Sequence, residues 1–221
     1  LEETKTDKVR LGKGEKHGRK KEAIVTSVYS IKRFIRTPEQ VVASYYDKIN
    51  VSTPSKPQNK HLWATLDGKD AALSRLAEQV QPRLGNHIQH TIALCDGCPS
   101  LQKRIANYFS DFVQVLDFIH ANEYLWKVAN ALFGETNDQR FDWMRSHTLQ
   151  LLSGKTKRLI AEFRSLARQP KISKRKHAQL LTTTNYFERN LLFMDYPTYL
   201  SNGWPIASGV IEGACRHFVK D

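Results

Sequence analysis

The sequence is poor in cysteine and has no long apolar run. Its 221 residues include three cysteines, too few for a disulfide framework, so we expect a reducing, intracellular setting. No uncharged apolar stretch approaches the ~20 residues needed to span a bilayer, which excludes a membrane-spanning helix. The first residues, Leu1–Lys8, are mostly charged and do not resemble a secretory signal peptide.

Motifs for nucleotide binding and serine hydrolysis are also missing. The chain contains no P-loop, no G-x-G-x-x-G and no G-x-S-x-G. Cys95-x-x-Cys98 lacks the second ligand pair that a structural zinc site needs, so we predict that these cysteines are structural and hold no zinc.

Acidic residues are scarce relative to basic ones. There are 22 Asp and Glu against 34 Lys and Arg, a formal charge of +12. Nine basic residues lie between Gly154 and His177, opposed by Glu162 alone. Because cationic side chains displace counterions from phosphates, this run predicts nucleic-acid binding. The alternatives are a solvated helix face and, less favoured, a membrane surface, for which no strongly amphipathic face accompanies the run.

The hydrophobic pattern predicts strands alternating with helices, followed by a helical block. Apolar runs that are rich in β-branched residues or closed by turn residues predict strands over 23–31, 61–66, 88–95 and 112–116. Helical spacing predicts a helix over 37–46, one that ends at about 80, one that begins at 99, and a long one that ends at Gly134. It also predicts helices over 137–193, with breaks near Gly154 and Pro170. We expect 196–205 to be a loop, and Ser208 to cap a final helix.

This order indicates an α/β fold with a helical insertion. We expect a polar, basic arm over 1–22, a core of strands and helices over 23–136, a helical insertion over 137–195, and a loop with the last helix over 196–221. In such folds, ligands gather at the carboxyl ends of the strands. Asp96 and Asp117 lie at such ends.

Two carboxylates are candidates for metal binding. Asp96 follows an apolar strand and precedes Gly97, a placement that suits Mg²⁺; the alternative is an Asp-Gly turn or a helix cap. Glu212 borders the expected buried face of the final helix, where a metal is one partner for its charge. The alternative is an ordinary pair with Arg216, four residues on. Asp117 and His120 lie three residues apart, on one side of a helix's first turn. They are either accessory groups of the site, or an Asp that caps the helix and a His whose hydrogen bonds are satisfied within the fold.

Taken in order, these residues resemble a known group of transposases. Asp96-Gly97, Asp117-x-x-His120, a helical insertion, and then Glu212 within Gly209–Arg216 resemble the Kra-type group of Mutator-like, insertion-sequence DDE transposases. Leu116–Ala121, Trp126–Ala129 and Tyr196–Leu200 are also similar to that group, and the likeness runs from about Lys21 to Asp221.

The resemblance implies an RNase H-like mixed sheet flanked by helices, in which two Asp and one Glu hold two Mg²⁺ or Mn²⁺ ions. Asp96 and Glu212 match the second Asp and the Glu as catalytic metal ligands, and Asp117 and His120 match an accessory motif. The first Asp, expected on a strand ahead of 23–31, has no match in 1–22. We therefore expect an N-terminally truncated fragment whose first strand and first Asp precede Leu1.

The sequence thus predicts a transposase catalytic domain that cleaves and joins DNA by metal-dependent phosphoryl transfer, inactive as this piece alone. A non-catalytic DNA-binding remnant and an RNase H-like nuclease are the alternatives. We expect a cytoplasmic, nucleoid-associated protein of bacterial type. Its expected partner is DNA, both the transposon ends and the target, and we expect no membrane association. A homo-oligomer is compatible with the sequence. Candidate DNA contacts are Lys155, Lys157, Arg158, Lys171, Lys174, Arg175, Lys176 and Arg216.

Overall fold

The chain folds into a mixed α/β structure. A computed structural model describes residues 22–47 and 54–208. Its elements are β1 Ile24–Ser30, α1 Pro38–Tyr46, β2 Gln58–Thr65, α2 Lys69–Val80, a 3-10 turn Gln81–Arg83, β3 Ile92–Cys95, α3 Pro99–Tyr108, β4 Val113–Leu116, α4 Phe118–Phe133, α5 Gln139–Leu152, α6 Thr156–Ala167, α7 Lys174–Asn190, a 3-10 turn Leu191–Phe193 and α8 Tyr196–Ser201. The expected α/β class is confirmed.

The strands form two separate pairs. β1 and β2 are antiparallel, with Ile24 opposite Thr65, and their register shifts between Val28 and Ser30. β3 and β4 are parallel, with Ile92 opposite Val113. All four expected strands are present, although β3 is shorter than the predicted 88–95.

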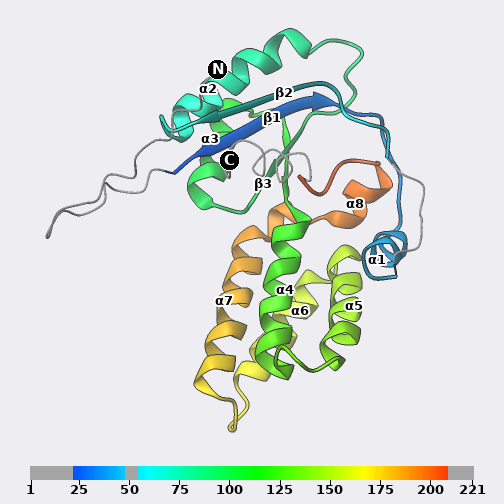
Figure 1. Cartoon of the computed structure of the whole chain (residues 1–221), viewed down its shortest axis with the longest axis vertical. Coiled ribbons are helices and arrows are strands. Elements are labelled where there is room, and N and C mark those ends of the chain that lie inside the picture. The colour runs from blue at the N-terminus through cyan, green and yellow to red at the C-terminus, as the bar shows by residue number, and fades with distance from the viewer. Residues whose placement is uncertain (1–21, 48–53, 209–221) are drawn as a thin grey trace, which may run out of the picture.

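Four helices form an antiparallel bundle that extends away from the strands (Figure 1). α4 leaves the end of β4, and α5, α6 and α7 follow with the predicted breaks near Gly154 and Pro170. Its core contains fully buried side chains from all four helices, among them Leu125, Met144, Leu151, Phe163 and Phe187. α4, expected within the 23–136 core, therefore packs with the helices expected in the insertion.

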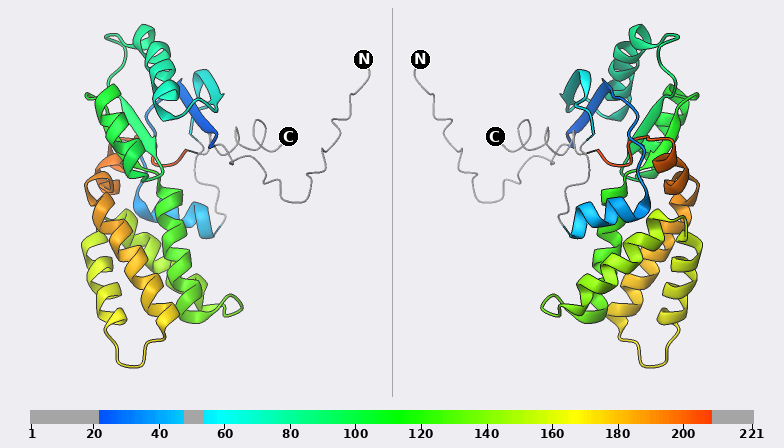
Figure 2. Two further views of the ribbon diagram at one scale, coloured as in Figure 1. Left: turned by 90° about the vertical axis from the view of Figure 1, so that its left-hand side faces the viewer. Right: turned by 90° about the vertical axis from the view of Figure 1, so that its right-hand side faces the viewer.

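β3 lies between this large core and a smaller one. Ile92 and Leu94 pack against the bundle side. Ala93 and Cys95, on the opposite face of the strand, pack against the smaller core formed with α2 and α3. Figure 2 shows these two helices beside the strands, at the end of the molecule opposite the α6–α7 turn. The carboxyl ends of β3 and β4 are thereby fixed at the junction of the two cores.

The segment over 196–205 is not the loop that we expected. Residues Tyr196–Ser201 form α8, with Pro197 in its first turn and the Asp195 carboxylate accepting a hydrogen bond from the Thr198 N–H. The turn-like composition of this segment does not exclude a helix, because proline is also favoured in a helix's first turn, and burial of Tyr196 and Tyr199 stabilises the helix here. Tyr196, Tyr199 and Leu200 are buried in the large core.

No helix within residues 22–47 and 54–208 has both the length and the apolar character needed to cross a bilayer.

Candidate functional site

Asp96 is held at the carboxyl end of β3 with its side chain exposed. Its Oδ1 accepts a hydrogen bond from the Cys98 N–H at 2.9 Å, and its backbone carbonyl accepts one from the Tyr186 hydroxyl at 2.9 Å. Gly97 has φ +79°, and a Cβ there would lie 2.8 Å from both Leu116 Cδ1 and Tyr186 Oη. The turn therefore fixes the backbone, while Oδ2 has no hydrogen-bond donor among the described residues.

Asp117 is a buried structural residue, with 1% of its surface exposed. Its Oδ1 accepts the Ile119 N–H at 2.8 Å, which caps α4. Its Oδ2 accepts the Ser208 N–H at 2.7 Å and the Ser208 hydroxyl. Of the two interpretations of this residue, the structure supports the helix cap, because both carboxylate oxygens are committed to neighbouring donors.

His120 and Asp96 line the same groove, although they lie on different elements. The two residues and Ser208 line one groove between β1 and β3. The imidazole Nδ1 of His120 is 3.5 Å from Glu123 Oε2, and the side chain is 40% exposed. Of the accessory pair, His120 therefore faces the groove with Asp96, whereas the carboxylate of Asp117 is bound to backbone.

Two hydrogen bonds of Asp117 join Cys95, the residue before Asp96, to Ser208, the last described residue before Glu212. The Asp117 N–H donates to the carbonyl of Cys95, the residue before Asp96, at 2.9 Å. The Asp117 carboxylate then accepts the Ser208 N–H. Glu212 and Arg216 themselves lie outside the described residues, as does any helix that Ser208 caps.

The two cysteines around Asp96 differ in environment. Burial raises the pKa of the Cys95 thiol to about 11. The hydrogen bond from Ser100 is the main cause that lowers the pKa of Cys98, which starts α3 and is partly exposed. Both are free thiols. Within residues 22–47 and 54–208, no three His, Cys, Asp or Glu side chains gather closely enough to hold a metal ion.

The basic run separates into two groups at opposite ends of α6. Lys155, Lys157 and Arg158 lie at its start, and a second group lies around the α6–α7 turn, comprising Arg168, Lys171, Lys174, Arg175 and Lys176. A helix of 12 residues spans about 18 Å, so these are two surfaces. Arg164, between them, is paired with Glu188 at 2.5 Å. Lys176 donates to the Leu132 carbonyl at 3.0 Å, whereas the others in both groups are exposed.

Six of these basic residues lie at helix N-termini, where basic residues are unfavourable: Lys155, Lys157 and Arg158 at the start of α6, and Lys174, Arg175 and Lys176 at the start of α7. Neither α6 nor α7 has an acidic residue in its first turn. The helix macrodipole places positive charge at this end, so lysine and arginine there repel it. Each of these helix starts therefore combines the positive end of the helix dipole with exposed cationic side chains.

Sequence analysis missed Tyr186 and Asn190 of α7. Tyr186 holds the Asp96 carbonyl, and the Asn190 Oδ1 accepts a hydrogen bond from Gln102 of α3 at 2.7 Å. Both contacts join residues about ninety positions apart, and no local pattern marks them. The Tyr186 contact connects the bundle to the end of β3, and the Asn190 contact connects it to α3.

Comparison of the chain with protein-family models, with characterised proteins and with solved structures found no significant match.

Proposed function

We propose that the chain is the catalytic region of a DNA transposase that works by metal-dependent phosphoryl transfer on an RNase H-like fold. The carrying observation is the hydrogen-bonded path from Cys95, the residue before Asp96, through Asp117 to Ser208. Glu212 follows Ser208 by four residues, and four residues span at most about 14 Å. This path supports a site in which Asp96 and Glu212 act together.

The oxygen ligands suit Mg²⁺ or Mn²⁺. Asp96 presents an exposed carboxylate on a fixed backbone, and hard divalent cations prefer such oxygens. Asp96 and Glu212 would hold the ions, whose chemistry is to activate water or a 3′-hydroxyl and to stabilise the leaving oxygen. His120, on the same groove, would donate a hydrogen bond to a phosphate oxygen from its imidazole ring.

DNA binding is supported by the two basic groups on α6 and α7. In each group, exposed cationic side chains lie near the positive end of a helix, so both would attract the same phosphate. Binding through phosphates is independent of base sequence and weakens as salt rises. The separation of the two groups indicates contacts with separate stretches of backbone.

The proposal is tested by DNA binding, cleavage and strand transfer. The 221-residue chain should bind DNA without cutting it, because 1–22 contain no match for the third carboxylate that would bridge the ions. In a form to which a strand bearing an Asp is added upstream, Mg²⁺- or Mn²⁺-dependent cleavage and joining should appear. That activity should vanish in Asp96→Asn and in Glu212→Gln, with DNA binding retained. Full activity of the Glu212→Gln protein would contradict the assignment.

A non-catalytic DNA-binding role is the second candidate. It is favoured by the burial of Asp117, which leaves Asp96 as the accessible acid at the ends of β3 and β4 among the described residues. Under this role the extended form would bind DNA and remain inactive with either metal. Cleavage without strand transfer would instead indicate a nuclease.

A further inference from the structure

Two tyrosines of neighbouring bundle helices stack beside the turn that carries Asp96. Tyr124 of α4 and Tyr186 of α7 have ring centroids 3.7 Å apart, and their ring planes differ by 9°. The two helices lie side by side and run in opposite directions (Figure 1). The Tyr186 hydroxyl donates to the Asp96 carbonyl at 2.9 Å. The stacked pair is therefore attached to the turn that presents the Asp96 carboxylate.

A cation covers the outer face of each ring. Lys127 Nζ lies 4.2 Å from the ring centroid of Tyr124, and the Arg189 guanidinium carbon lies 5.7 Å from that of Tyr186. Each cation follows its tyrosine by about one helical turn. Because α4 and α7 are antiparallel, the two cations lie at opposite ends of the stack. The order is therefore Lys127, Tyr124, Tyr186 and Arg189.

Neither cation is neutralised within the described part of the chain. Lys127 and Arg189 are exposed, and neither belongs to an ion pair there. The acids nearest to them in sequence have other neighbours: Glu123 Oε2 is 3.5 Å from His120 Nδ1, and Glu188 pairs with an arginine of α6. An aromatic ring attracts a cation through its quadrupole and carries no net charge. The rings thus hold both cations in place and leave their charge available to an external anion.

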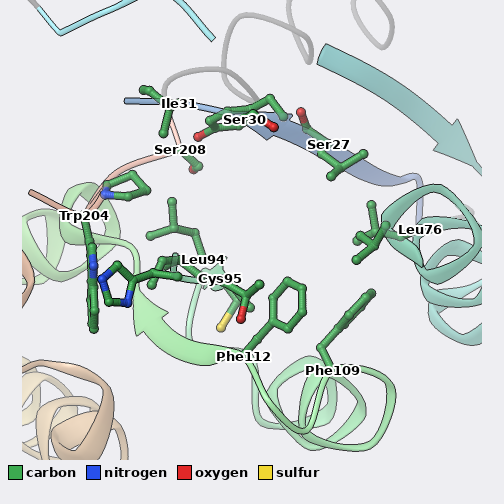
Figure 3. Close-up of a pocket in the computed structure, with 18 of the residues that line it drawn as sticks. Ser27, Ser30, Ile31, Leu76, Leu94, Cys95, Phe109, Phe112, Trp204 and Ser208 are labelled. Atoms are coloured by element: carbon green, nitrogen blue, oxygen red, sulfur yellow. The ribbon is translucent and has the colours of Figure 1, made fainter. Parts of the chain in front are cut away.

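On α4, the stack is continuous with the groove that holds Asp96. His120, Tyr124 and Lys127 recur at the spacing of one helix face. His120 and Asp96 both line the groove between β1 and β3. Figure 3 shows this groove, with Cys95, the residue before Asp96, beside its open space. One face of α4 therefore leads from the groove to Lys127.

On α7, the stack is continuous with the basic group at the start of the helix. An exposed stripe runs down α7 from Arg189 through Asn185, Thr182 and Ala178 to Arg175. It contains no acid and has a cation at each end. At 1.5 Å per residue, it is about 21 Å long, which is close to six nucleotide steps of about 3.4 Å. This stripe matches the backbone of a polyanion better than it matches a single small anion.

We propose that Lys127 and Arg189 bind two phosphates of one duplex DNA backbone, and that the Tyr124–Tyr186 stack positions both cations so that this backbone passes Asp96. Because the rings already restrict both side chains, less conformational freedom is lost when DNA binds. The inference rests on the proposed function and adds to it the contacts that place DNA at the site. Tyr124 is a positioning residue, since it acts through Lys127.

The test separates charge from positioning by measuring the affinity for a fluorescently labelled DNA duplex over a series of salt concentrations. Lys127→Gln and Arg189→Gln each remove one cation from an exposed position. Each should weaken binding about fivefold at low salt and flatten the slope of log K against log salt by about 0.9. Lys60→Gln, at an exposed position on β2 away from the bundle, is the matched control and should leave the slope unchanged.

Two variants of Tyr124 test the positioning role. Tyr124→Leu keeps both cations but removes one ring, so we expect affinity to fall about threefold while the slope stays the same. Tyr124→Phe keeps the ring face and should bind DNA as the original protein does. Equal affinity of the Leu and Phe variants would overturn the positioning role. Circular dichroism checks that each variant is folded, and the two glutamine variants decide the phosphate contacts even if Tyr124→Leu unfolds.

The outcomes distinguish these contacts from the proposed function. If the original chain binds DNA and either glutamine variant keeps its slope, the phosphate contacts are wrong and DNA binding stands. An equal loss in Lys60→Gln would show diffuse charge attraction and would also overturn them. Flattened slopes in a protein whose upstream-extended form never cleaves DNA would support the contacts and contradict the transposase. A chain that binds no DNA would contradict both.

Discussion

The carboxylate of Asp117 binds both the backbone N–H and the hydroxyl of Ser208, across 91 positions of sequence. Asp117 ends a strand and caps α4, so one buried side chain fixes three segments: β4, α4 and the stretch after α8. The chain toward Glu212 is thereby anchored beside the carboxyl end of β3.

Removing this carboxylate should destabilise the protein. Asp117→Ala deletes a helix cap and leaves buried donors unpaired, and we expect a loss of about 2 kcal/mol or more in the free energy of unfolding. Ser208→Ala, which keeps the backbone N–H, should cost about 1 kcal/mol. Urea denaturation monitored by circular dichroism measures both. An Asp117→Ala protein as stable as the original would contradict the anchoring role.

The turn after Asp96 should tolerate glycine alone. Gly97→Ala combines a positive φ with a Cβ contact of 2.8 Å to Leu116 and Tyr186, so we expect a loss of about 2–3 kcal/mol. Gly134→Ala is the matched control, because Gly134 has φ +88° but open space around it. The difference in unfolding free energy between the two variants isolates the steric contact. Equal losses would mean that the packing of Leu116 and Tyr186 against Gly97 does not contribute to the free energy of unfolding.

The positive charge at the start of α7 should lower the protein's stability and raise its affinity for DNA. Lys174→Glu places an acid at a helix N-terminus, which should stabilise the protein by about 0.3–1 kcal/mol while weakening DNA binding. Lys103→Glu, an equal charge change at an exposed position within α3, controls for net charge. Thermal denaturation and fluorescence anisotropy with labelled DNA give the two readouts. Weaker binding of equal size in both variants would remove α7 from the DNA surface.

Salt dependence should report how many phosphates the protein neutralises. Replacing Lys174, Arg175 and Lys176 together with alanine should flatten the slope of log K against log salt by up to ~0.9 for each phosphate that is no longer neutralised. Lys176 is bound to the Leu132 carbonyl, so we expect Lys174 and Arg175 to account for most of the change. An unchanged slope would refute phosphate binding at this turn.

The two cysteines beside Asp96 should react differently. The pKa of Cys98 is lowered, so its thiolate forms at a lower pH than that of a free cysteine, and alkylation by iodoacetamide should begin there first. Cys95, buried and with a pKa of about 11, should react only after unfolding in urea. Peptide mass spectrometry across pH 6–10 assigns each site. Stoichiometric zinc that survives dialysis against a weak chelator would overturn the further prediction that the pair binds no metal.

Local patterns predicted the elements well and their connections poorly. The β-branched run before Lys32 and the glycine at 134 mark a strand and a helix end by backbone preferences that act within a few residues. The helix at Tyr196–Ser201 was missed because burial of its tyrosines, a tertiary effect, outweighs its turn-like composition. Asp96's exposure after β3 followed from the strand pattern. The Tyr186 and Ser208 contacts depend on how the bundle packs on the strands, which no local spacing encodes.

Nuclear magnetic resonance with Mn²⁺ on this 25.4 kDa chain tests whether Asp96 binds a divalent metal together with Glu212. Titrated Mn²⁺ should broaden amide signals around the carboxyl ends of β3 and β4. The broadening should be lost in Asp96→Asn and reduced in Glu212→Gln. It should be unchanged in Asp111→Asn, because Asp111 is an exposed acid just before the start of β4, at the end of the strand away from Asp96. Broadening that persists in Asp96→Asn, or that centres on another part of the chain, would show that Asp96 does not bind the metal.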